Sequence, residues 1–122
     1  MAQLYTARRP LVLATVDGFV LGSTSLTTLL QVGPVTGHLF EVAPTLEVVS
    51  GATTVTLLVT WTSPRGPAVQ YNWYTGQVVS GIAGQLPWNM EASVGSGQPI
   101  TLQAQAATAG QVYVGGSISR KR

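Results

Sequence analysis

His38 is the only histidine of the chain and the first residue to consider for catalysis. A serine hydrolase needs a serine, a histidine and an acid in one hydrogen-bonded arrangement, and many carry the serine in a nucleophile-elbow motif. The sequence has no such motif, and His38 stands two residues before Phe40 in a strand-like stretch. We therefore expect His38 to be a half-exposed strand or turn residue and the protein not to be an enzyme. A hydrolase that used His38 and an acid would lose its activity in a His38→Ala variant.

The four acids, Asp17, Glu41, Glu47 and Glu91, offer a second kind of chemistry, because glycoside hydrolysis uses two converging carboxylates. Glu41 and Glu47 flank Pro44, where a kink would bring them together. Isolated surface carboxylates are the commoner case, so we expect no catalytic pair. The chain has no cysteine, one histidine and no spaced Asp/Asn run, so we expect neither a metal site nor a cofactor.

Four aromatic residues are candidates for a contact surface: Tyr71, Trp73, Tyr74 and Trp88. One interpretation is a platform on which sugar rings stack. Tyr71 and Trp73 share strand parity with Val69, however, while Tyr74 has the opposite parity with Gln70 and Asn72. This pattern favours a role in the core or in a subunit interface.

The composition favours contact with other proteins. Charged residues make up 8% of the chain, against about a quarter in an average domain. Thr, Ser, Gln and Gly supply most of the polarity. Hydroxyl and amide groups can be satisfied by neighbouring groups when they are covered, whereas a buried charge needs a matched partner. The surface is therefore easier to desolvate than an ionic one.

The basic residues lie at the two ends of the chain, with Arg65 as the one internal exception. The end residues, which are our candidates for binding a larger protein lattice, are Arg8, Arg9, Arg120, Lys121 and Arg122. A nucleic-acid-binding domain would carry a basic stripe on its folded face, and none is present, so we expect no nucleic-acid partner. Polar residues and Pro34 interrupt the uncharged stretch 18–40, so we expect no membrane-spanning helix. The acid at position 17 also interrupts the apolar run that a signal peptide would need.

Strand-like segments recur about every ten residues and are separated by Gly, Pro, Asn and Asp signals. The expected strands are 11–16, 19–22, 26–32, 38–43, 45–49, 53–63, 68–74, 86–94, 99–106 and 111–119, with one of the first two irregular. Expected breaks include Pro44, Ser50-Gly51 and Thr75-Gly76. This pattern predicts an all-β, single-domain antiparallel β-sandwich or barrel at residues 11–119, between an arm at 1–10 and a basic tail at 120–122.

Two local features are specific enough to predict in detail. Ser63-Pro-Arg-Gly66 suits a type I turn, which would pair 53–63 with 68–74 as a hairpin. Gly115-Gly116 inside a strand indicates a bulge or a close approach of two backbones. The sheet edges have almost no lysine to protect them, so we expect either short edges or edges covered by neighbouring subunits.

The order of the motifs resembles that of small jelly-roll structural proteins of tailed-phage virions. The motifs are Gly37-His-Leu-Phe-Glu-Val42, Thr54-Val-Thr-Leu-Leu-Val-Thr-Trp-Thr62, Gly97-Gln-Pro-Ile-Thr-Leu-Gln103 and Gln111-Val-Tyr-Val-Gly115. The resemblance extends over about residues 11–119. Phe40 replaces the tyrosine that is frequent in the first of these motifs, and the basic ending replaces an acidic one.

The resemblance implies a jelly-roll-like β-sandwich that forms a homotrimer and docks on a larger lattice of the virion as a capsid decoration, head-fibre or tail-accessory protein. The alternative is a carbohydrate-binding receptor module at the tip of a tail fibre. In that case a glycan would be the ligand, and Trp73→Ala or Trp88→Ala would abolish binding without unfolding the protein.

Overall fold

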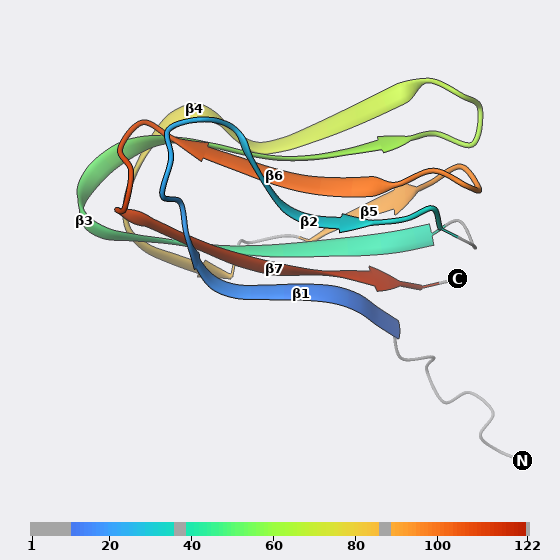
Figure 1. Ribbon diagram of the computed structural model, residues 1–122, viewed down its shortest axis with the longest axis horizontal. Helices are drawn as coiled ribbons and strands as arrows, with labels where there is room; N and C mark the ends of the chain where they lie inside the picture. The colour runs from blue at the N-terminus through green and yellow to red at the C-terminus, as the bar shows by residue number, and fades with distance from the viewer. Residues whose placement is uncertain (1–10, 36–38, 86–88, 122) are drawn as a thin grey trace, which may run out of the picture.

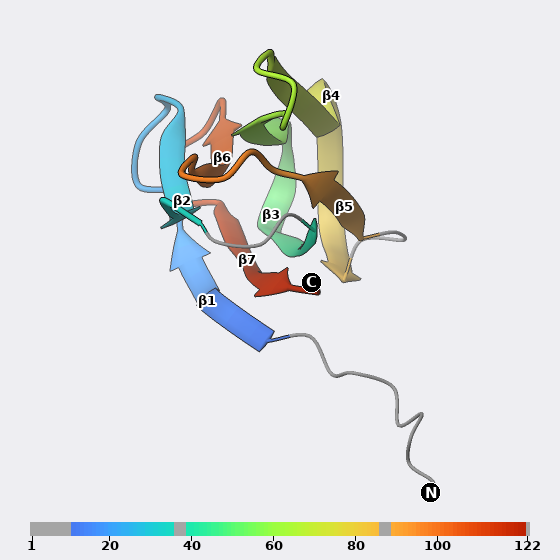
Figure 2. The same cartoon turned by 90° about the vertical axis from the view of Figure 1, so that its right-hand side faces the viewer.

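The computed structural model describes residues 11–35, 39–85 and 89–121 and shows an all-β sandwich of two antiparallel four-stranded sheets (Figures 1 and 2). No described segment is a helix of the length and apolarity needed to cross a membrane. The strands are β1 (Leu11–Val20), β2 (Thr27–Val32), β3 (Leu39–Thr62), β4 (Ala68–Gln85), β5 (Met90–Ser93), β6 (Ile100–Ala106) and β7 (Val112–Arg120).

The long strands β3 and β4 each contribute to both sheets. The first half of β3 pairs with β7 on one side and with β5 and the end of β4 on the other. The second half of β3 pairs with β6 and with the start of β4. The outer strand pairs are β1–β7 and β2–β6. Counted from the two ends of the fold inward, each strand of the first half of the chain therefore pairs with the matching strand of the second half. This is the jelly-roll order, so the predicted fold class is confirmed.

Alternating apolar side chains of both sheets fill the core. In the first half of β3 the inward residues are Phe40, Val42, Leu46 and Val48, and in the second half they are Val55, Leu57, Val59 and Trp61. The change from even to odd numbers occurs at the bend around Gly51, which has a φ of 65°. The strand predicted at 53–63 is present, and its odd-numbered residues point inward because strands place successive side chains on opposite faces.

The predicted hairpin is confirmed. β3 and β4 pair antiparallel from Leu57 opposite Tyr74 to Thr62 opposite Ala68. The turn closes with a hydrogen bond from the Gly66 N–H to the Ser63 carbonyl at 2.9 Å, and the Ser63 hydroxyl accepts a second one from the Arg65 N–H. The proline and glycine therefore occupy the positions that a type I turn favours.

The expected breaks at Pro44, Ser50-Gly51 and Thr75-Gly76 were wrong, because the strands continue through all three. Pro44 lies between the segment of β3 that pairs with β5, ending at Val42, and the segment that pairs with β4, starting at Thr45. A proline has no N–H to give to a ladder, and here it stands opposite a gap in the ladder. Gly51 and Gly76, both with positive φ, absorb a bend and a bulge without ending the strand.

The ends of the fold differ slightly from the expected boundaries. β1 is one strand from Leu11 to Val20, in which Asp17 and Gly18 together face Gly115. β7 extends to Arg120, and the N–H of Lys121 donates to the carbonyl of Leu39. These two basic residues are therefore held against the sandwich and are not part of a free tail.

Both a bulge and a close approach of two backbones occur at Gly115-Gly116, so the prediction for these residues is confirmed. Two residues of β1 oppose Gly115, which is a bulge in the β1–β7 ladder. A Cβ on Gly116 would lie 2.9 Å from the carbonyl oxygen of Ala43. The backbones of β7 and β3 therefore approach each other too closely for a side chain at this point.

Candidate functional site: an uncharged sheet face

The outer face of the sheet formed by β2, β6, the second half of β3 and the start of β4 carries no charged side chain. We call this surface the neutral face. Two cross-strand rows form its centre: Thr28, Gln103, Leu58 and Asn72 in one, and Gln31, Thr101, Thr60 and Gln70 in the other. Thr54, Thr56, Thr62 and Gln105 continue the polar side of β3 and β6.

The polar groups of the neutral face bond to one another. The side-chain amide of Gln31 donates to the Thr101 hydroxyl at 3.2 Å, and that of Gln70 donates to the Asn72 side chain at 2.8 Å. The Gln103 amide donates to the Thr28 hydroxyl at 3.4 Å. Covering this face removes water from groups that already have partners, so the desolvation penalty is small compared with that of a charged face.

Leu58 is a buried apolar residue in the middle of the neutral face. It lies opposite Gln103 on one side and Asn72 on the other. Leu58 was not among the residues predicted for a site. Its signal in the sequence is that it is the single apolar residue at the polar parity of Thr54, Thr56, Thr60 and Thr62. Because Leu58 is already buried in the single subunit, it packs among its polar neighbours and adds little apolar surface to the neutral face.

The opposite sheet has a different outer face, which carries all four acids of the chain and which we call the acidic face. Glu41 and Glu47 lie on β3, Glu91 on β5 and Asp17 on β1. The register places them on the outer side because their neighbours along the strands, such as Phe40 and Leu46, point into the core. The two outer faces of the sandwich therefore differ completely in charge.

The structure keeps Glu41 and Glu47 apart and brings a different pair of carboxylates together. Glu41 and Glu47 are six residues apart on a continuous strand, or about 20 Å at the usual rise, so the expected kink does not join them. Glu41 and Glu91 are direct cross-strand partners. Glu91 forms an ion pair with Lys121, and Glu41 accepts a hydrogen bond from the Asn89 side chain at 2.9 Å. These neighbours offset the like charges, which indicates a structural pair.

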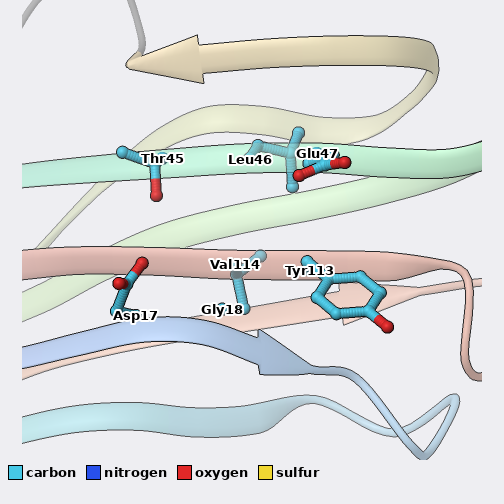
Figure 3. Close-up of a pocket in the computed structure, with 7 residues that line it drawn as sticks. All are labelled: Asp17, Gly18, Thr45, Leu46, Glu47, Tyr113 and Val114. Carbon is cyan, nitrogen blue, oxygen red and sulfur yellow. The ribbon is translucent and has the colours of Figure 1, made fainter.

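A shallow hollow of about 120 Å³ opens on the acidic face. Figure 3 shows its lining, with Asp17 and Gly18 on β1, Tyr113 and Val114 on β7, and Thr45, Leu46 and Glu47 on β3. A larger hollow of about 280 Å³ lies at one end of the neutral face, among Thr54, Thr56, Gly76 and Gln105. The described residues hold no group of three or more His, Asp or Glu able to bind a metal ion.

The aromatic candidates belong mainly to the core. Trp73 is 8% exposed, and its ring meets that of Tyr71 edge to face, with centroids 5.3 Å apart. Tyr74 also packs against the core, so its predicted outward direction was wrong. The cause is a bulge in β4: Leu57 pairs with Tyr74 while Leu58 pairs with Asn72, which leaves Trp73 as an extra residue. Trp88 and His38 lie outside the described residues.

The basic candidates do not form one patch in the part of the chain that the structure describes. The Arg120 side chain lines a small hollow together with Leu13, Val32, Pro34 and Val35, and Lys121 pairs with Glu91. Arg8, Arg9 and Arg122 lie outside the described residues. Comparisons with protein-family models, curated proteins and solved structures found no match to this chain.

Proposed function

We propose that this protein is a non-enzymatic structural component of a virion, a trimeric capsid decoration or tail-accessory protein that docks on a larger protein lattice. The neutral face is the observation that carries this proposal. A four-stranded sheet face without a charge, with several of its polar side chains bonded to each other, is suited to being covered by protein.

The fold is consistent with this role, since the jelly roll recurs in viral capsid domains. It also recurs in lectins, so the fold alone does not decide between assembly and glycan binding. The position of Trp73 favours assembly, because a side chain that is 8% exposed offers no ring face on which a sugar can stack.

In this proposal the neutral face and the basic residues make different contacts. The neutral face contacts neighbouring subunits, while basic residues contact the lattice: Arg120 and Lys121 at the end of β7, with Arg8, Arg9 and Arg122. A charged lattice surface complementary to these residues would steer docking and set its orientation more than its strength.

The experiment that tests the subunit contact places a charge on each sheet face in turn. Thr60→Lys puts a lysine between Thr101 and Gln70 on the neutral face, and Ser117→Lys puts one on the acidic face at a similarly half-buried position of a central strand. We expect light scattering of the purified protein to give a mass that is a multiple of three subunits. The Thr60→Lys protein should have a mass that is no longer a multiple of three subunits, with its fold intact by circular dichroism. The mass of Ser117→Lys should remain a multiple of three subunits.

A wild-type mass that is not a multiple of three would overturn the trimer, and equal masses for the two variants would exclude the neutral face as the contact. The virion assignment has a separate test. Mass spectrometry of purified particles should find this chain at a copy number that is a multiple of three.

A further inference from the structure

Strand β1 is poorly covered by the described residues of the sandwich. It lies at the margin of its sheet (Figures 1 and 2) and, among the described residues, its ladder partner is β7. No residue from Val12 to Val20 is buried. Phe19 is 40% exposed, although its partner Val114 on β7 is fully buried. A sandwich strand normally buries alternate side chains, so the described residues of the single subunit leave the inner side of β1 uncovered.

The free edge of β1 also lacks the usual protection against pairing. Segment 11–20 contains no lysine, arginine or proline, and Asp17 is its single charge. Four of its large apolar side chains are exposed: Val12, Leu13, Phe19 and Val20. Exposed apolar edge strands present unpaired backbone groups that pair readily with another chain.

The sequence of β1 is complementary to itself when two copies run in opposite directions. Apolar residues occupy both ends, and Thr15 and Asp17 flank Val16 in the middle. Antiparallel pairing centred on Val16 places Val12 of each copy opposite Val20 of the other. All four of these side chains then lie on the outer face, because Val12 and Val20 are cross-strand partners of Ser119 and Tyr113.

The charge of Asp17 selects this direction. Parallel pairing in register would place the two Asp17 carboxylates side by side, and like charges directly opposite destabilise a sheet. Antiparallel pairing about Val16 places each Asp17 opposite a Thr15 hydroxyl, which can donate a hydrogen bond to the carboxylate. Leu13, the extra residue of β1 between Val12 and Ala14, then faces Phe19 of the other copy.

We infer that β1 is a contact between two copies of this chain, in which the β1 strands pair antiparallel about a two-fold axis at Val16. The contact joins two four-stranded sheets into one of eight strands and covers Phe19. It goes beyond the proposed function and does not depend on it, since the neutral face is on the other sheet. With both contacts present the assembly closes at six subunits, and with β1 alone it closes at two.

The absence of cysteine from the chain allows a direct test. In Val16→Cys the two thiols face each other across the axis, with Cβ atoms about 4.5–5.5 Å apart, near the range that a disulfide spans. We expect mild oxidation to give a covalent dimer on the order of a hundredfold faster than in Ser96→Cys, because a held pair has a far higher effective concentration. Ser96 is an exposed turn residue outside both β1 and the neutral face, so it reports random collision.

A second variant tests the contact without oxidation. Val20→Lys places a lysine opposite Val12 on the outer face of each copy and should halve the subunit number measured by light scattering, from six to three or from two to one. Thr15→Ser, which keeps the hydroxyl, should leave that number unchanged. An odd subunit number for the wild type, or equal oxidation rates for the two cysteine variants, would overturn the inference. Both results would point instead to a different protein as the occupant of this edge.

Discussion

Gly115 on β7 and Thr45 on β3 lie so close together that a Cβ on Gly115 would stand 2.6 Å from the Thr45 hydroxyl oxygen. The carbonyl oxygen of Val16 on β1 would be 3.0 Å away. Three strands therefore meet at a position where only glycine fits. This point fixes the spacing of the β1–β7–β3 part of the sheet.

Gly115→Ala is expected to lower the free energy of unfolding by about 1–3 kcal/mol, the usual cost of inserting a methyl group into a packed site. Denaturant unfolding measures the change. Thr45→Ala in the same chain should recover part of the loss by removing one of the two close contacts. Gly22→Ala is the control, because a Cβ at Gly22 meets no atom within 4 Å. Equal losses for Gly115→Ala and Gly22→Ala would contradict the close approach.

Trp73→Ala is expected to destabilise the protein by about 3–5 kcal/mol, as truncations of large buried aromatic residues do. The substitution removes the edge contact with Tyr71 and opens a cavity in the core. Val78→Ala on the same strand is the control, since Val78 is 74% exposed and its loss should change stability by no more than about 0.5 kcal/mol. A folded Trp73→Ala protein of wild-type stability would show that this residue is not part of the core.

The charges around Glu91 predict which of two substitutions costs more stability. Glu91 lies opposite Glu41 and pairs with Lys121, so Glu91→Gln removes a repulsion together with an attraction and should change stability by less than about 1 kcal/mol. Lys121→Gln leaves the two carboxylates facing each other and should cost more than Glu91→Gln. In about 1 M salt, where the screening length is about 3 Å, the difference should vanish. A larger loss for Glu91→Gln in low salt would contradict this account.

Local patterns in the sequence predicted much of the fold. The strand at 53–63 and the Ser63-Pro-Arg-Gly66 turn depend on residues close together in the chain, and the structure has both. The same local signals failed at Pro44 and Gly76. There the ladder partners supplied by distant strands decide whether a strand continues, and a single segment does not contain that information.

The candidate site shows the same limit. Composition predicted a surface poor in charge, but it did not say on which sheet face the uncharged residues would gather. That all four acids gather on the opposite face follows from the register of β1, β3 and β5, which non-local pairing determines. The direction of the Tyr74 side chain depends on a bulge of one extra residue in β4, which no pattern in the sequence of 68–74 indicates.

Because β3 is one strand of 24 residues that belongs to both sheets, the two sheets of this sandwich share a continuous backbone. Pulling the sheets apart would require breaking β3 itself out of its ladders with β4, β6 and β7 at once. Tension that enters at one sheet is therefore carried covalently to the other.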